Sequence, residues 1–240
     1  MTPYLLLEIR RNLRNVPFLV YTIAFPVGFY VLFATVFSGT GAGSNTYAAH
    51  YMVSMALYAI MGTGLTGVGA RIAFERSRGW TRQLALTPMR PLAYVAIKAG
   101  SAILLTVPVI GLVMLAGLTF GGVRLPVGVW LLLVPLLWCA SLPFTALGIA
   151  IGYTLREELS AGVSVALLFV FAIAGGLWMP AQFFPQWLRD VAGALPSYQG
   201  AQLGWRLVDG HQPASLGLPI FVAWLVGCAV LAGWRFRRAS

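Results

Sequence analysis

Charged residues are scarce in this sequence. They make up 9% of its 240 residues, whereas hydrophobic residues make up 59%. A soluble globular domain has roughly 25% charged residues, so the shortage excludes an ordinary soluble domain and indicates a membrane protein with several spans. The net charge of +10 does not indicate nucleic-acid binding, because the charges cluster at the ends of apolar runs. We expect no nucleic-acid partner.

Residue types that carry catalysis or bind metals are also few. The chain has two histidines and two cysteines, and Cys139 and Cys228 both lie inside apolar runs. We therefore expect no disulfide. The phosphate-binding pattern G-x-x-x-x-G-K-[ST] is missing, since the single lysine, Lys98, follows an isoleucine. Metal-ligand clusters and nucleophile–base sets are missing from the sequence too, so we expect no enzyme activity and no cofactor bound by this chain.

Ionisable residues are absent from the middle of the apolar runs, and Lys98 comes closest to one. Proton- and ion-coupled transporters generally place Asp, Glu, His or Arg inside the bilayer. This argues against a secondary transporter. Any work that such a membrane domain does must be energised by a partner.

Six apolar runs of about 20 residues are what the sequence does contain, and this is the length that crosses a bilayer. We expect an all-α membrane protein with six transmembrane helices in one domain over residues 1–240. The expected spans are 17–37, 51–70, 92–120, 127–154, 161–179 and 216–234.

The distribution of Lys and Arg predicts the orientation of the spans. Thirteen of these residues fall on one side and three on the other. Basic residues near span ends are retained in the cytoplasm, so we expect both termini to be cytoplasmic. Residues 1–16 have helical apolar spacing and should lie on the inner membrane surface, in contact with lipid headgroups. The alternative is an ordinary basic lead-in to the first span.

The basic loop 71–91 lies between the second and third spans. Glu75 is its one acid among five arginines. Arg71, Glu75 and Arg78 fall on one helical face, where they can pair, although an exposed pair contributes only about 0–1 kcal/mol. Gly79 is a natural helix stop.

A short second helix is expected beyond Gly79, with Trp80 and Leu84 projecting together. A helix with an exposed aromatic residue and a basic rim could fill a groove on a soluble partner. The alternative is a solvated connector that only orients the spans.

Two other segments carry structural signals. The second span contains Gly62, Gly64, Gly67 and Gly69, which suit close helix contact, either within one subunit or across a dimer. The external segment 180–213 should contain a helix that begins at Pro185 and ends before Pro196. It either lies at the outer interface or dips inward as a hairpin from the turn at 175–180.

Three segments, in this order, resemble one family. The first is RRNLRNVPFLVYTIAFPVGFYVLFATVF at 10–37, and the third is GGLWMPAQFFPQWLRDVAGALPSY at 175–198. Between them stands the pattern ER-x-x-G-x-x-x-x-L-x-x-x-P, formed by Glu75, Arg76, Gly79, Leu84 and Pro88. The chain resembles the permease subunits of type-2 ABC transporters, the bacterial drug and polysaccharide exporters, over nearly its whole length.

The resemblance implies an N-terminal interfacial elbow helix, an external hairpin between spans five and six, and a bacterial plasma (inner) membrane location. It also implies a dimer, homo- or heteromeric, of six-span permease subunits. Two cytoplasmic ABC ATPase subunits would bind ATP and Mg. By this resemblance the ATPase contacts are Glu75, Arg76, Gly79, Trp80, Leu84 and Pro88 in the loop, and Arg156, Glu157 and Glu158 in a second, shorter segment. The family usually has a small residue where Trp80 stands.

The function implied is ATP-driven export of amphipathic or hydrophobic small molecules by a non-catalytic permease subunit. The alternatives are export of a lipid or lipid-linked glycan, or a non-transporting membrane scaffold or sensor. In the resembling family the path lies near spans two and five, at the dimer seam. By position, the candidate path residues are Met55, Tyr58, Phe169 and Trp178. The alternative is that they are ordinary core or lipid-facing residues.

Overall fold

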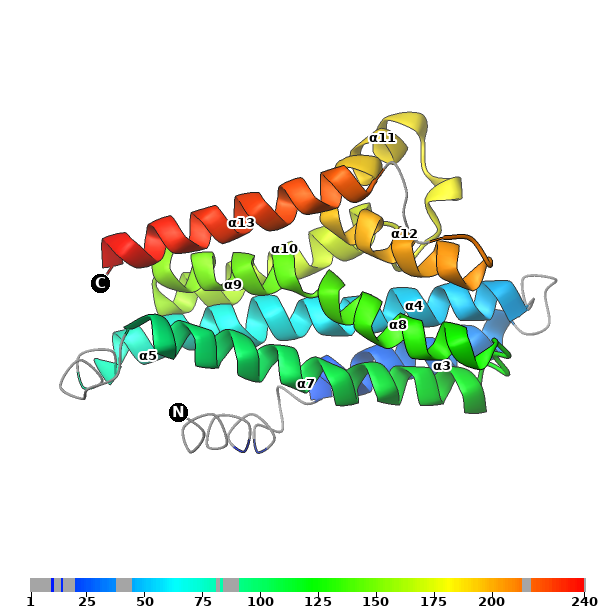
Figure 1. The fold of residues 1–240 in the computed structure, drawn as a ribbon, viewed down its shortest axis with the longest axis horizontal. Coiled ribbons are helices and arrows are strands. Elements are labelled where there is room, and N and C mark those ends of the chain that lie inside the picture. Colours follow the sequence, from blue (N-terminus) through cyan, green and yellow to red (C-terminus); the bar gives the residue numbers. More distant parts are fainter. Residues whose placement is uncertain are drawn as a thin grey trace.

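The computed structural model describes residues 10, 14, 20–37, 45–80, 83, 91–212 and 217–239, and within these residues the chain forms helices and no strands (Figure 1). The elements follow in the order η1 (Val20–Ala24), α3 (Phe25–Phe37), α4 (Asn45–Gly62), η2 (Thr63–Ala70), α5 (Arg71–Ser77), α7 (Pro91–Thr119), α8 (Val127–Ala140), α9 (Leu142–Thr154), α10 (Glu157–Ala174), η3 (Ala181–Phe183), α11 (Gln186–Ala194), α12 (Pro196–Val208) and α13 (Leu218–Ala239).

Five helical segments in the described part of the chain are long and apolar enough to cross a membrane. They are Asn45–Ser77, Ala93–Thr119, Val127–Thr154, Glu157–Ala174 and Leu218–Arg238, and they correspond to the second to sixth expected spans. The first expected span is represented by a shorter apolar helix, Thr22–Val36. Its beginning, and nearly all of the expected interfacial helix 1–16, lie outside the described residues. The count of six spans therefore stays a prediction.

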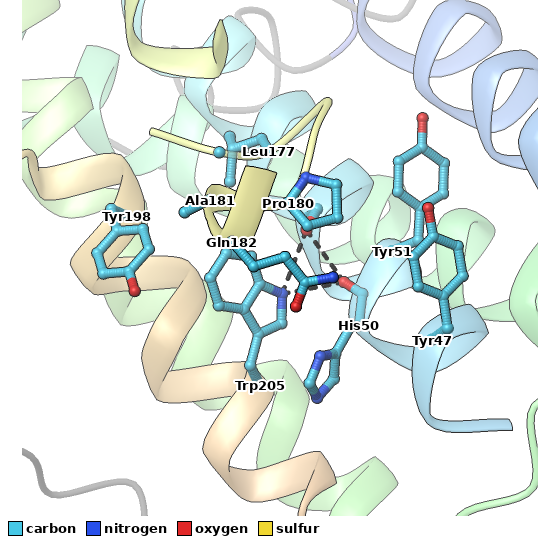
Figure 2. A pocket seen from close by; sticks show the side chains of 11 residues that line it. Tyr47, His50, Tyr51, Leu177, Pro180, Ala181, Gln182, Tyr198 and Trp205 are labelled. Atoms are coloured by element: carbon cyan, nitrogen blue, oxygen red, sulfur yellow. Dashed lines mark hydrogen bonds between the residues drawn. The ribbon is translucent and has the colours of Figure 1, made fainter. Parts of the chain in front are cut away.

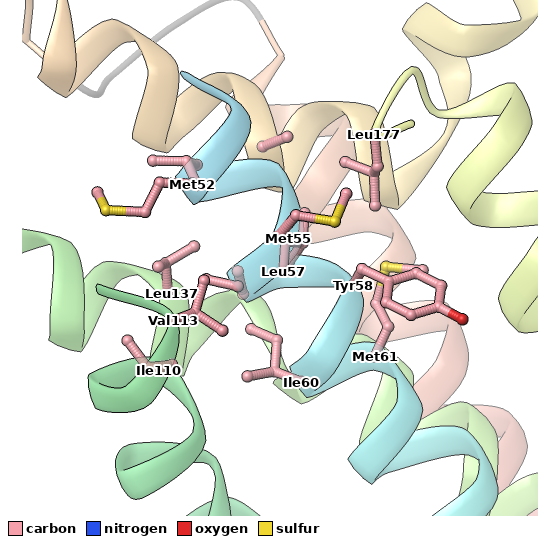
Figure 3. Packing of buried hydrophobic residues seen from close by; sticks show 14 of the residues in the cluster. Met52, Met55, Leu57, Tyr58, Ile60, Met61, Ile110, Val113, Leu137 and Leu177 are labelled. Carbon is pink, nitrogen blue, oxygen red and sulfur yellow. The ribbon is translucent and has the colours of Figure 1, made fainter. Parts of the chain in front are cut away.

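The second span is the centre of the bundle. Helices α4, η2 and α5 join without a break, and every residue from Tyr51 to Leu65 is buried. A helix that is apolar on all sides is stable only where other helices surround it. Its side chains form the core against α7, α8 and α10, and Met52, Met55 and Ile60 are among them (Figure 3).

The glycines of the second span bring it against α9. A methyl group added at Gly69 would lie 2.9 Å from the carbonyl oxygen of Gly148, and one added at Gly152 would lie 2.7 Å from that of Gly69. The two backbones therefore touch, which the small residues were expected to permit. The contact lies within one subunit. The second span is a π-helix at this point, Thr63–Ala70.

The fourth expected span, 127–154, consists of two helices. Helix α8 ends at Ala140, and α9 begins at Leu142 with Pro143 in its first turn. Proline suits a first turn because its missing N–H would have no intrahelical partner there. The span is therefore interrupted at Ser141.

The segment between α10 and α13 differs in part from expectation. Helix α10 ends at Ala174, and Gly176 turns the chain with a φ of +72°. Helix α11 begins after Pro185, as predicted. Pro196, however, does not only end that helix but also starts α12, which packs against α4, α8 and α13. The sequence pattern did not predict α12.

Candidate functional site

Glu75 lies in α5, at the end of the second span, and its side chain is 3% exposed. Its carboxylate accepts hydrogen bonds from Lys98 Nζ at 2.7 Å and from Tyr94 Oη at 2.6 Å, and both donors are in α7. Arg71, one helical turn earlier, places its Nε 3.9 Å from the same carboxylate. Because Lys98 is itself only 2% exposed, an ion pair sealed from solvent joins α5 to α7.

The exposed setting expected for Glu75 is wrong. The predicted pairing with Arg71 is present, but the closer partner is Lys98, from another helix. Contacts between helices depend on tertiary packing, so spacing within one helix could not reveal this one. Burial of two charges carries a desolvation penalty that only close pairing and further hydrogen bonds offset. Glu75 therefore has a larger structural role than a surface pair would have.

The next two residues of α5 contact two further spans. Arg76 Nη1 donates to the carbonyl of Gly152 in α9 at 2.8 Å, and its guanidinium lies 5.5 Å from the ring centroid of Tyr153. Ser77 Oγ donates to Glu157 Oε2 at 2.5 Å, at the start of α10. The structure thus places the two predicted coupling segments side by side.

The remaining predicted coupling residues are placed as follows. Gly79 has a φ of +71°, which a helix stop requires and glycine adopts without strain. Trp80 is 37% exposed. Arg156 and Glu158 are exposed beside the partly buried Glu157. Two predicted residues lie outside the described part of the chain: Leu84 and Pro88.

Three of the four predicted path residues are in contact. The ring centroid of Trp178, just after α10, lies 5.7 Å from that of Tyr58 in α4 and 5.4 Å from that of Phe169 in α10. The indole N–H of Trp178 is buried and has no hydrogen-bond partner in the described structure. The fourth residue, Met55, is fully buried in the core.

Helix α3 supplies aromatic residues to this cluster that the sequence analysis missed. The rings of Phe25 and Phe29 lie 6.0 and 5.6 Å from the ring of Trp178. Phe29 also contacts Phe33 at 5.5 Å. The signal was present, because these phenylalanines are four residues apart and so share one face of a helix. We call Phe25, Phe29, Tyr58, Phe169 and Trp178 the aromatic cluster.

This arrangement can bind and position, and it has few groups for bond-making chemistry. The aromatic cluster offers ring surfaces and one free indole N–H. Within the described residues, no group of three or more His, Cys, Asp or Glu could hold a metal ion. The buried charges of α5 connect it to neighbouring helices and so stabilise the end of the second span.

Comparison with known proteins gives the family. Residues 5–203 match the ABC-2 type transporter family. The chain is also similar to a Bacillus subtilis (strain 168) protein named "Putative transport permease YvfS", with 30% identity over 219 residues, which are 91% of this chain and 89% of that protein. The match to the family includes the second span, α5 and the aromatic cluster. The chain therefore belongs to the ABC-2 type transporter family and is a multi-pass membrane subunit of a transporter.

Proposed function

We propose that this chain is the membrane-spanning subunit of an ATP-driven exporter of amphipathic or hydrophobic small molecules. A separate cytoplasmic ABC ATPase binds ATP and Mg and supplies the energy, and a second permease subunit completes the membrane part. Family membership supports transport and an ABC ATPase partner in general. The export direction, substrate class and subunit composition belong to the proposal.

The observation that carries the proposal is the attachment of α5 to three other spans. Lys98 and Tyr94 attach it to α7, the Gly152 carbonyl to α9, and Glu157 to α10. Energetic coupling between distant sites can be carried by packed side chains and hydrogen-bond networks of this kind. A partner that presses on α5 would therefore move three membrane helices together.

The charge distribution supports a cytoplasmic position for α5. The 13-to-3 division of Lys and Arg places α5, the start of α10 and the end of α13 on the basic side. In Figure 1 these three segments lie at the same end of the bundle.

The aromatic cluster supports the substrate class. Binding sites for small molecules are lined mainly by apolar and aromatic groups, with a few polar groups that fix orientation. The aromatic cluster has this composition, and its members come from three separate parts of the chain.

The test is export by proteoliposomes that contain the chain and the ATPase that copurifies with it. We expect ATP-dependent movement of Hoechst 33342, an amphipathic dye. Arg76→Ala removes the contact with Gly152 and should lower transport severalfold. Arg78→Ala is the matched control, because Arg78 lies over the Phe74 ring of its own helix and should transport normally.

Three results would reject the proposal in favour of an alternative. Movement of a fluorescent lipid but not of the dye would indicate lipid or lipid-linked glycan export. ATPase copurification without ATP-dependent movement of either probe would indicate a scaffold or sensor. Equal transport by the two arginine variants and the wild type would show that α5 is only a connector.

A further inference from the structure

A cavity of about 270 Å³ (Figure 2) lies at the end of the bundle where α4 begins, and α5 lies at the opposite end (Figure 1). The first turns of α4, the turn after α10 and helix α12 enclose it. Five of its eleven described lining residues have aromatic side chains, and they are Tyr47, His50, Tyr51, Tyr198 and Trp205. None of the predicted site residues that the structure describes lines it.

Some polar groups in this wall bind one another, whereas the buried Tyr51 hydroxyl has no hydrogen-bond partner in the described structure. The Trp205 indole N–H donates to the His50 carbonyl at 3.0 Å and to Ser54 Oγ at 3.2 Å. Ser54 Oγ donates to the same carbonyl at 3.0 Å. The His50 ring nitrogen Nε2 lies 2.8 Å from Asp209 Oδ1. Trp205 is therefore held in place with its N–H occupied, and what it can offer a ligand is its ring face.

The composition of the cavity wall limits the chemical class of ligand that can bind. The described lining includes no Lys or Arg, and the nearby Arg189 guanidinium is engaged by the Gln182 and Phe184 carbonyls, so the wall itself offers an anion no counter-charge. A sugar would need many hydrogen-bond partners, and the Trp205 N–H, Ser54 Oγ and His50 Nε2 are already engaged. Aromatic faces attract cations that lie within about 6 Å of a ring centroid. Tyr198 and Trp205 stand 5.7 Å apart, edge to face, and Asp209 brings a carboxylate beside His50.

We propose that this cavity binds the head group of an amphipathic organic cation through the ring faces of Tyr47, Tyr198 and Trp205. Its volume suits a head group, because pockets for whole drug-sized ligands measure about 300–1,000 Å³. The inference rests on the proposed function, because export would bring such a cation to this end of the bundle. The binding itself does not depend on transport and is measured without an ATPase.

The experiment measures protection of a cysteine placed in the cavity wall. Gln182, which lines the cavity and is exposed, is changed to cysteine in a chain with Cys139→Ser and Cys228→Ser. Maleimide labelling of the purified chain is followed with benzyltrimethylammonium, with its uncharged isostere 2,2-dimethylpropylbenzene, and with maltose. The cation should slow labelling at a concentration about fivefold below the one its isostere needs, the affinity difference that one cation–π contact predicts, and maltose should not slow it.

The same protection is then measured in Tyr198→Leu and Tyr47→Leu, which remove one ring from either side of the cavity. Each should abolish most of it. Trp187→Leu is the matched control, because Trp187 is 67% exposed on α11 and does not line the cavity, so protection should persist. Thermal unfolding establishes that each variant is folded. One folded tyrosine variant is enough to test the proposal.

Several results would overturn the proposal. Equal protection by the isostere would show an apolar pocket without preference for charge, and protection by maltose would show a sugar site. Protection that survives in a folded tyrosine variant, or none in the parent chain, would remove the site. Loss of dye export with protection intact would count against the proposed function and leave the cation site standing.

Discussion

The Glu75–Lys98 pair gives the clearest energetic prediction for single residues. Glu75→Gln leaves the buried Lys98 ammonium without its carboxylate, and an uncompensated buried charge costs about 3–5 kcal/mol. Lys98→Met should cost less, because Arg71 remains 3.9 Å from Glu75. The double variant should recover much of the loss. Thermal unfolding in detergent should therefore rank Glu75→Gln lowest, Lys98→Met next and the double variant above both.

A non-additive result is the essential part of this prediction. If the double variant loses as much stability as the two single variants combined, the two side chains do not interact. Ser101→Ala, one turn further along α7, is the matched control. The Ser101 hydroxyl bonds only to the Lys98 carbonyl within its own helix, so its removal should change stability little.

At the same scale, the aromatic cluster predicts a change in substrate preference. An aromatic pair contributes about 0.5–1.5 kcal/mol beyond buried area, which corresponds to a factor of roughly 2–10 in affinity. Tyr58→Ala and Phe169→Ala should shift the ratio of transport of a flat aromatic dye to that of an aliphatic amphiphile by this factor. Phe120→Ala, at the exposed end of α7, should leave the ratio unchanged. A fall in protein abundance with an unchanged ratio would make these residues structural only.

At the scale of the helices, the contact between the second span and α9 allows a test with two glycine-to-alanine variants. We expect their effects on stability to differ in direction. A methyl group at Gly148 would run into the carbonyl of Gly64, and overpacking of this kind costs about 1–3 kcal/mol. Gly162 in α10 has nothing within 4 Å of an added methyl group, and alanine favours a helix over glycine by about 0.8–1.0 kcal/mol. Thermal unfolding should show Gly148→Ala destabilised and Gly162→Ala unchanged or stabilised. Equal effects would disprove the close backbone contact.

The elements also show how far sequence reasoning reaches. Five spans matched their apolar runs, because span length is fixed by the bilayer and needs no tertiary information. Helix α11 begins directly after Pro185, as the proline predicted. Helix α12 was missed, because a proline that ends one helix can equally start the next, and only burial of α12 against α4 and α8 decides between them. Position in the chain was enough to group Tyr58, Phe169 and Trp178. The ion pair of Glu75 with Lys98, 23 residues away, could be found only from the packing of the folded bundle.

At the scale of the whole molecule, the orientation in the membrane decides which side α5 and the cavity each face. The end of the bundle with α5 carries most of the Lys and Arg, and the end with the cavity carries the His50–Asp209 pair. The positive-inside rule predicts that the first end is cytoplasmic. The ATPase would then meet α5 inside, and the cation site would open outside.

Cysteine labelling tests this orientation directly. In a chain with Cys139→Ser and Cys228→Ser, cysteine is placed at Ser77 in α5 or at His211 after α12, both of which are exposed. A membrane-impermeant maleimide should label His211→Cys in intact cells, because that residue is expected outside. It should label Ser77→Cys only after permeabilisation. The reverse pattern would show that the protein has the opposite orientation in the membrane. It would rule out both the cytoplasmic contact of α5 and the external position of the cavity.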